Sequence, residues 1–264
     1  MTTQLPVYGP RQAAPRPKRG APNAVRWTLA VLLCLAIGGG TGYGITTLQR
    51  GRLPGLHTAS DGRWAFPRTA PPALQPGEPL PGDRRANPAG RHFAALGGLL
   101  VPLPRGAVRE ATARGGAVPT LLALYQPGGR TKMSAAISEE RLRSSAAEAW
   151  SMPDGTHTVV VLLQAKTGAE AESLLTEHLD VRSMDTPTLA KAAEVRSDDD
   201  EQTIAPHSAK AIAYAEAEPY GDEQVRIAYS VMGDTVAVVA QWHRAYTPPL
   251  PFHQTAVLQN RLLA

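Results

Sequence analysis

Hydrophobic residues gather into one long uncharged run near the start of the chain and into shorter periodic stretches after residue 91. The long run extends from Trp27 to Gln49, 23 residues without a charge, between Arg26 and Arg50. At about 1.5 Å per helical residue it would reach ~34 Å, enough to cross a hydrocarbon core of roughly 30 Å. We therefore predict a transmembrane helix at residues 27–49, with the lipid bilayer as its partner.

The same run also fits a cleaved secretory signal, with residues 24–37 as the apolar region. Gly38 with Gly40, or Gly42 with Gly44, would then be the small residues before the cut. An uncleaved anchor is favoured, because a long segment precedes the run and because the run stays uncharged for a full bilayer width. Spacings of four residues, Gly38 to Gly42 and Gly40 to Gly44, would also allow homodimerisation through one helix face.

The orientation of this helix follows from the charges around it. Five basic residues and no acidic residue precede the run, and four basic residues follow it up to Arg68. A basic leader before the first hydrophobic segment favours a cytoplasmic N-terminus and an extracellular C-terminal domain at the cell membrane. The inverted topology, with the domain in the cytoplasm, is the alternative, because the difference in charge is small.

The segments on either side of the run have no apolar period. Residues 1–26 are basic and rich in proline, which predicts a disordered tail. Residues 50–90 contain eight prolines and six glycines, which predicts a semi-extended linker. A folded domain would then occupy residues 91–264.

Within that domain the first clear pattern is a hairpin followed by a helix. Pro153 to Gly155 form a turn signal before an almost continuously apolar strand at residues 158–164. Thr167 and Glu170 then have the spacing of a capping box, in which Glu170 reaches back to Thr167. Leucines at helical spacing follow, so we predict a helix that ends near Asp180.

Three alternating strands close the domain. They lie within residues 209–218, 225–232 and 235–242, with a two-residue turn at Gly233 and Asp234, and a helix follows at residues 252–263. Before the hairpin, residues 99–105 and 120–126 are interpreted as short strands and residues 133–142 as a helix. The predicted fold is α+β: an antiparallel sheet of a hairpin plus a three-stranded meander with one buried face, and helices packed on one face.

The charge of the chain changes along its length. Residues 1–90 hold 11 basic and 3 acidic residues, a net charge of +8, whereas residues 91–264 hold 16 basic and 20 acidic residues, a net charge of −4. Affinity for nucleic acid rests largely on clustered cations that neutralise phosphates, so the acidic domain argues against a nucleic-acid partner. Cys34 is the only cysteine, so the domain can form neither a disulfide nor a thiolate metal site.

No motif in the domain identifies a reaction, and we predict no catalytic, cofactor-binding or metal-binding residue and no cofactor. The histidines have no zinc-site spacing, and neither GxSxG nor SxxK is present. His178 is expected to be half-buried on its helix, and His157 and His243 lie at strand ends. Paired carboxylates remain open, because glycosidase carboxylates are set by geometry and not by sequence spacing. The acidic run at residues 198–201 is interpreted as a solvated loop.

LLVPLPRGA and the later AEAWSMPDGTHTVVVLLQAKTGAEAESLL resemble uncharacterised membrane-anchored or secreted proteins of high-GC actinobacteria. The resemblance covers most of residues 95–264 and implies an exported α+β domain. Its motifs are architectural and imply no ligand.

These observations favour a single-pass membrane protein that displays a non-enzymatic extracytoplasmic domain for binding, sensing or envelope assembly. Its ligand or protein partner in the envelope is not indicated by the sequence. The alternative is an envelope hydrolase whose carboxylates converge only in the fold. Two carboxylates about 5–10 Å apart in one cleft would favour the hydrolase, whereas an apolar groove would favour a binding protein.

Overall fold

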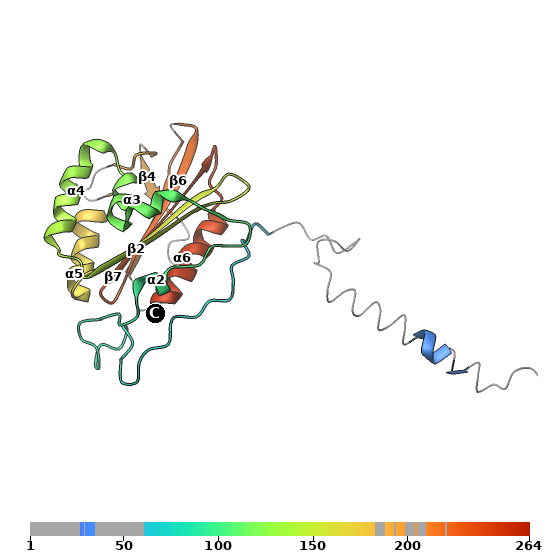
Figure 1. Cartoon of the computed structure of the whole chain (residues 1–264). Coiled ribbons are helices and arrows are strands. Elements are labelled where there is room, and N and C mark those ends of the chain that lie inside the picture. Colours follow the sequence, from blue (N-terminus) through green and yellow to red (C-terminus); the bar gives the residue numbers. More distant parts are fainter. Residues whose placement is uncertain are drawn as a thin grey trace, which may run out of the picture. The chain divides into compact units, whose positions relative to one another are not determined.

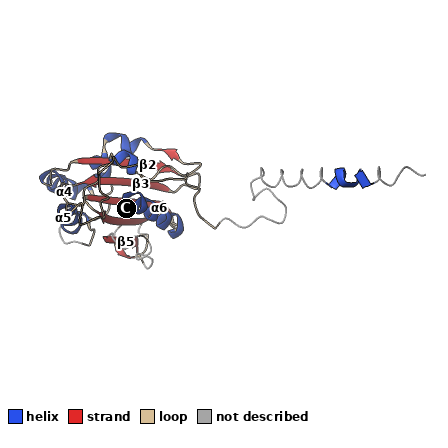
Figure 2. Ribbon diagram, turned by 90° about the horizontal axis from the view of Figure 1, so that it is seen from below, coloured by secondary structure: helices blue, strands red, loops and turns tan. Residues whose placement is uncertain are grey.

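In the computed structural model, the hairpin and the meander join in one antiparallel sheet of seven strands, in the order β1-β2-β3-β7-β6-β5-β4. The structure describes residues 27–28, 30–34, 61–182, 188–192, 194–198, 204, 210–219 and 221–264. Figure 2 shows β2 and β3 towards one side of the sheet and β5 towards the other. The α+β class and the antiparallel sheet are therefore confirmed. The strands are β1 (Val108–Arg109), β2 (Ser144–Ser151), β3 (His157–Gln164), β4 (Val195–Ser197), β5 (Lys210–Glu216), β6 (Glu223–Met232) and β7 (Thr235–Arg244).

Helices cover both faces of this sheet, so the prediction of helices on one face was wrong (Figure 1). Helices α3, α4 and α5, with the π-helical turn η3, pack on one face, and α6 packs on the other. Helix α2 and the 3-10 turn η2 are shorter. The bounds are α2 (Leu96–Leu99), η2 (Ala111–Gly115), α3 (Ala117–Ala123), α4 (Pro127–Glu139), α5 (Gly168–Ser173), η3 (Leu174–Leu179) and α6 (Pro249–Leu263).

The two helical layers explain why β3 is apolar along its whole length. Val159 and Val161 belong to the core under α3 and α4, whereas Val160 belongs to the core under α6. The meander follows the same rule, because Ala228 and Val239 are buried against α6. The expectation of one buried face was therefore wrong: the sheet forms the middle layer of three.

Local signals placed several elements correctly. The Thr167 hydroxyl accepts a hydrogen bond from the Glu170 N–H (3.2 Å) and begins α5 as predicted. The reciprocal bond is shifted by one residue, because the Glu170 carboxylate accepts from the Lys166 N–H (2.9 Å). Residues 120–126 were predicted as a strand, but residues 117–123 form α3, and residues 99–105 contain no strand.

The compact unit begins at Gly62, within the segment predicted as a linker, instead of at residue 91. Trp64 is only 9% exposed and packs in the core under α6. The side chain of Gln254 in α6 makes two hydrogen bonds to the Trp64 backbone. The Gln254 amide oxygen accepts from the Trp64 N–H and the Gln254 amide nitrogen donates to the Trp64 carbonyl, both at 2.9 Å. Gln259 brackets Leu99 and Val101 in the same way (2.8 and 2.9 Å). Polar side chains of α6 thus fix this proline-rich segment to the domain.

Most of the predicted membrane span lies outside the described residues. Residues 27–28 and 30–34 are helical, with Trp27 and Leu33 exposed. Among the helices that the structure describes, none is long and apolar enough to cross a membrane. The tail at residues 1–26 and the glycines at 38, 40, 42 and 44 also lie outside the described residues.

Two tyrosine hydroxyls meet in the core under α3 and α4. The Tyr125 hydroxyl is 3.0 Å from that of Tyr229 and donates to the Leu179 carbonyl at 3.1 Å. Burial raises the pKa of both phenols well above the ordinary value of 10, and the mutual hydrogen bond partly offsets this for Tyr125. Because the Tyr125 hydroxyl donates its one hydrogen to Leu179, Tyr229 must be the donor between the two hydroxyls. The pair thus completes its hydrogen bonds without an ionised group.

The raised pKa values predict that the protein loses stability at alkaline pH. Above about pH 10 these two phenols ionise in the unfolded chain but stay protonated in the folded one, so rising pH favours unfolding. The free energy of unfolding should fall by up to about 1.4 kcal/mol per pH unit for each of them. Tyrosinate absorbance should show at least two fewer ionised tyrosines in the native than in the unfolded protein, because Tyr125 and Tyr229 stay protonated. In Tyr229→Phe this difference should be smaller by one; an unchanged difference would contradict the assignment.

Candidate functional site

An apolar cavity of about 300 Å³, which we call the sheet pocket, opens between α3 and the middle strands of the sheet. Its floor combines Val159 of β3, Ile227 of β6 and Ala240 of β7, and α3 contributes its end at Ala123. Volumes from about 300 Å³ are typical of small-molecule sites. Its lining residues are Glu110, Thr112, Pro119, Thr120, Ala123, Leu124, Val159, Leu189, Lys191, Val225, Ile227, Ala240 and Trp242.

The charged and aromatic residues of the sheet pocket contact one another. His157 stacks on Trp242, with ring centroids 5.5 Å apart and planes inclined by 4°, and the His157 Nδ1 lies 2.6 Å from a Glu110 carboxylate oxygen. The Lys191 ammonium lies 5.3 Å from the centre of the Trp242 ring and also pairs with Glu223. These contacts hold the indole in place at the end of β7, beside the cavity.

The interior of the sheet pocket is suited to hydrocarbon. The buried Thr120 hydroxyl donates to the Gly116 carbonyl at 2.7 Å, Glu110 is bonded to His157, and Lys191 is paired with Glu223. Among the described lining residues, Glu110 is the one acidic side chain. A polar group placed inside would lose its bonds to water without finding partners, at a cost of about 1–3 kcal/mol. The arrangement therefore selects an apolar group.

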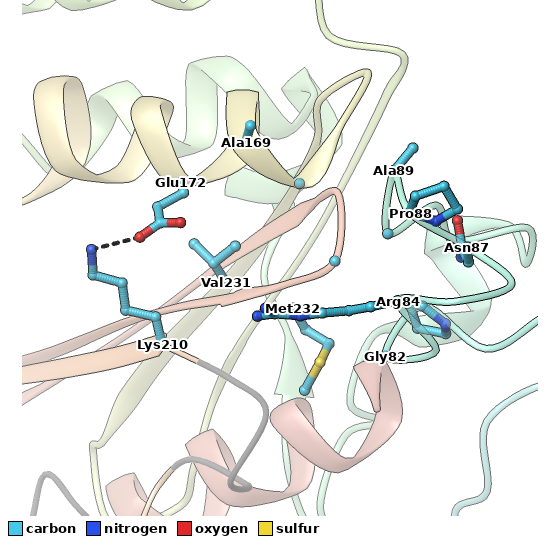
Figure 3. Close-up of a pocket in the computed structure, with 14 residues that line it drawn as sticks. Gly82, Arg84, Asn87, Pro88, Ala89, Ala169, Glu172, Lys210, Val231 and Met232 are labelled. Atoms are coloured by element: carbon cyan, nitrogen blue, oxygen red, sulfur yellow. Dashed lines mark hydrogen bonds and ion pairs between the residues drawn. The ribbon is translucent and has the colours of Figure 1, made fainter.

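A second cavity of about 490 Å³, the loop cleft, lies between the loop at residues 81–90, the start of α5 and the β6–β7 turn. Figure 3 shows Lys210 and Glu172 on one side and Asn87 on the other. The Lys210 ammonium pairs with Glu172 at 3.0 Å, and both side chains are about half exposed. The Asn87 amide is bonded to the backbone of Leu80 and Arg91. The polar groups of the loop cleft thus serve mainly to hold its own walls.

The β6–β7 turn beside the loop cleft is fixed by a buried carboxylate, Asp234. One oxygen accepts from the His92 N–H (3.1 Å) and lies 2.8 Å from the His92 Nδ1. The other accepts from Arg143 and from Gln164, both at 3.0 Å. The His92 Nε2 is 2.9 Å from the Leu263 carbonyl, at the end of α6. This network joins the loop before α2, the start of β2, the end of β3, the β6–β7 turn and the last helix, and it is structural.

The sequence placed none of these groups in a site. His178 is half-buried, as predicted, and His157 contacts Glu110 and Trp242, whereas the His243 Nε2 lies 2.9 Å from the Asp154 carbonyl. Asp198, interpreted as part of a solvated loop, is buried and pairs with Arg226 at 2.6 Å. In the described ranges, no three histidine, cysteine or acidic side chains are grouped as a metal site would require.

The missed residues share one cause: their partners are distant in sequence. His157 meets Trp242 because β3 pairs with β7 in the register that sets these two residues opposite each other. The one signal in the sequence was that each of these two residues lies near one end of an apolar strand. The order of the strands decides that those ends are neighbours.

Comparisons with known proteins give one partial likeness. The chain is 32% identical over 122 residues to a subunit of the NADH-quinone oxidoreductase of Streptomyces coelicolor. This region is 42% of the present chain and 13% of the Streptomyces protein, so the likeness does not show a family. No family model matches the chain, and no solved structure matches it.

Proposed function

We propose that this chain is a single-pass membrane-anchored protein whose extracytoplasmic α+β domain binds an apolar ligand in the sheet pocket. The observation that carries the proposal is the chemistry of that pocket: its floor is aliphatic, and its two charged lining residues each contact a partner outside the lining, Glu110 with His157 and Lys191 with Glu223. Binding energy would come from removing apolar surface of the ligand from water, about 25 cal/mol per Å².

The geometry gives the hydrolase alternative less support. A hydrolase would need two carboxylates flanking one bond of the substrate. In the sheet pocket, Glu110 stands at the rim against His157, and the lining offers the ligand mainly alkyl groups. Such a surface favours the binding protein over the enzyme.

The binding proposal predicts that a larger side chain at the end of α3 weakens the binding of an apolar probe. Ala123 is exposed and lines the sheet pocket, so Ala123→Phe should obstruct it with little effect on folding. The matched control is Ala135→Phe, since Ala135 is exposed on α4 and does not line this pocket. We expect at least tenfold weaker binding of N-phenyl-1-naphthylamine, a loss of about 1.4 kcal/mol, in Ala123→Phe alone. Equal binding by both variants, or no binding by the unaltered protein, would refute the proposal.

The proposed anchor and topology need a separate measurement. Protease added to spheroplasts should digest the domain. Without protease, the full-length protein should be found in the membrane fraction. Protection of the domain would support the inverted topology. A shortened, soluble product would identify residues 27–49 as a cleaved signal.

A further inference from the structure

We infer that the natural occupant of the sheet pocket is one alkyl chain of a membrane lipid, whose headgroup stays outside beside Trp242 and Lys191. This inference rests on the proposed function, because it assumes both the membrane anchor and the apolar binding site. It adds the chemical class of the ligand and its source, which is the bilayer.

The lining of the sheet pocket supports an alkyl chain. Its floor consists of aliphatic side chains from three adjacent strands, including Val159, Ile227 and Ala240, and the Thr120 hydroxyl is bonded to the backbone. An alkyl chain has no polar group, so it gives up no hydrogen bond to water when it enters. An alkyl chain in this cavity is shielded from water by the aliphatic side chains.

The rim supports an amphiphile whose polar end remains in water. The Lys191 side chain is 45% exposed and the His157 side chain 38% exposed, so both reach solvent while they contact Trp242. Indole rings with one wet and one apolar side are typical of membrane–water interfaces. The Lys191 ammonium is already paired with Glu223, and the Glu110 carboxylate also lies at this rim against His157, so the rim suits a zwitterionic or uncharged headgroup better than a strongly anionic one.

The length of the tether supports the bilayer as the source. The predicted span ends at Gln49 and the compact unit begins at Gly62, so twelve residues connect them. Fully extended at about 3.3–3.6 Å per residue, they reach at most ~43 Å. Had the domain begun at residue 91, the reach would have been more than three times longer. A tether of this length limits the distance between the predicted span and Gly62, the start of the domain, and so gives the domain access to the bilayer surface.

The test is photolabelling of the full-length protein in phosphatidylcholine vesicles. A small fraction of the lipid carries a diazirine at the end of one acyl chain, and labelled residues are located by mass spectrometry after irradiation. We expect label on α3 and on β6 or β7 residues that line the sheet pocket, in the unaltered protein and in Ala135→Phe. In Ala123→Phe this label should fall at least fivefold, while label in residues 27–49 stays the same.

The other outcomes separate this inference from the proposed function. Label confined to residues 27–49 would overturn the lipid inference and leave the anchor in place; if N-phenyl-1-naphthylamine still binds, the pocket takes an apolar ligand from another source. Pocket label that is unchanged in Ala123→Phe would mean random surface labelling and would also overturn the inference. A protein that stays unlabelled and does not sediment with the vesicles would overturn both the anchor and the lipid inference.

Discussion

Replacing Asp234 by alanine should lower the free energy of unfolding by about 2–6 kcal/mol, because the buried donors of His92 and Gln164 lose their acceptor at about 1–3 kcal/mol each. Arg143, in contrast, is 40% exposed and can be hydrated. The carboxylate is fully buried and accepts hydrogen bonds from His92, Arg143 and Gln164. Without it, these donors remain around an apolar methyl group and lose their acceptor. Asp234→Asn keeps the shape and one acceptor oxygen, so its loss should be smaller.

Urea unfolding of residues 62–264, followed by the fluorescence of their three tryptophans, of which Trp150 is fully buried, would measure this effect. The matched control is Asp222→Ala. The side chains of Asp222 and its partner Arg244 are more than four-fifths exposed and 3.6 Å apart, so we expect a change within about 0.5 kcal/mol. A loss below about 1 kcal/mol in Asp234→Ala would show that the network does not hold the fold together.

Gly233→Ala should lower stability by about 3 kcal/mol. Gly233 has φ = +53°, a left-handed conformation that costs other residues roughly 1–2 kcal/mol. An added Cβ would lie 2.1 Å from the Gly90 carbonyl oxygen and 3.0 Å from the Pro81 Cβ. The Gly90 oxygen accepts the Asp234 N–H at 2.7 Å, so the loop must move away and lose this bond, an overpacking cost of about 1–3 kcal/mol.

Gly77→Ala separates these two costs. Gly77 has φ = +93°, but a Cβ there would meet no atom within 4 Å. We expect a loss of about 1–2 kcal/mol from the backbone conformation alone. Faster hydrogen exchange at the Asp234 amide in Gly233→Ala, but not in Gly77→Ala, would show that the loop has moved. Equal losses in the two variants would mean that the close approach to Gly90 is unimportant.

Elements with strong local patterns were predictable. The turn at Pro153 to Gly155, the cap at Thr167 and the turn at Gly233 and Asp234 depend on residues a few positions apart, and the structure has all three. The strand predicted at residues 120–126 was wrong because a short apolar stretch does not show whether its period is that of a helix or of a strand. Packing against β2 and β3 holds most of that stretch as helix α3.

The candidate site was not predictable to the same degree. The sheet pocket depends on the β3–β7 pairing, which places His157 opposite Trp242, and on the position at which α3 packs against the sheet. Aliphatic residues in strands are expected in any core. Whether a space remains between them depends on packing that local sequence does not specify.

The sequence by itself determined the antiparallel α+β class, most strands of the sheet, the two later helices and the anchor hypothesis, because these follow from periodicity, turn residues and the length of an uncharged run. Only the tertiary structure decided that helices cover both faces, that the domain begins at Gly62, and that Asp234 is a structural centre instead of a turn residue. The physical reason is distance along the chain: Asp234 contacts residues 70, 91 and 142 positions away, and Gln254 contacts Trp64 across 190. Such contacts are fixed by the burial of complementary groups once the sheet has formed.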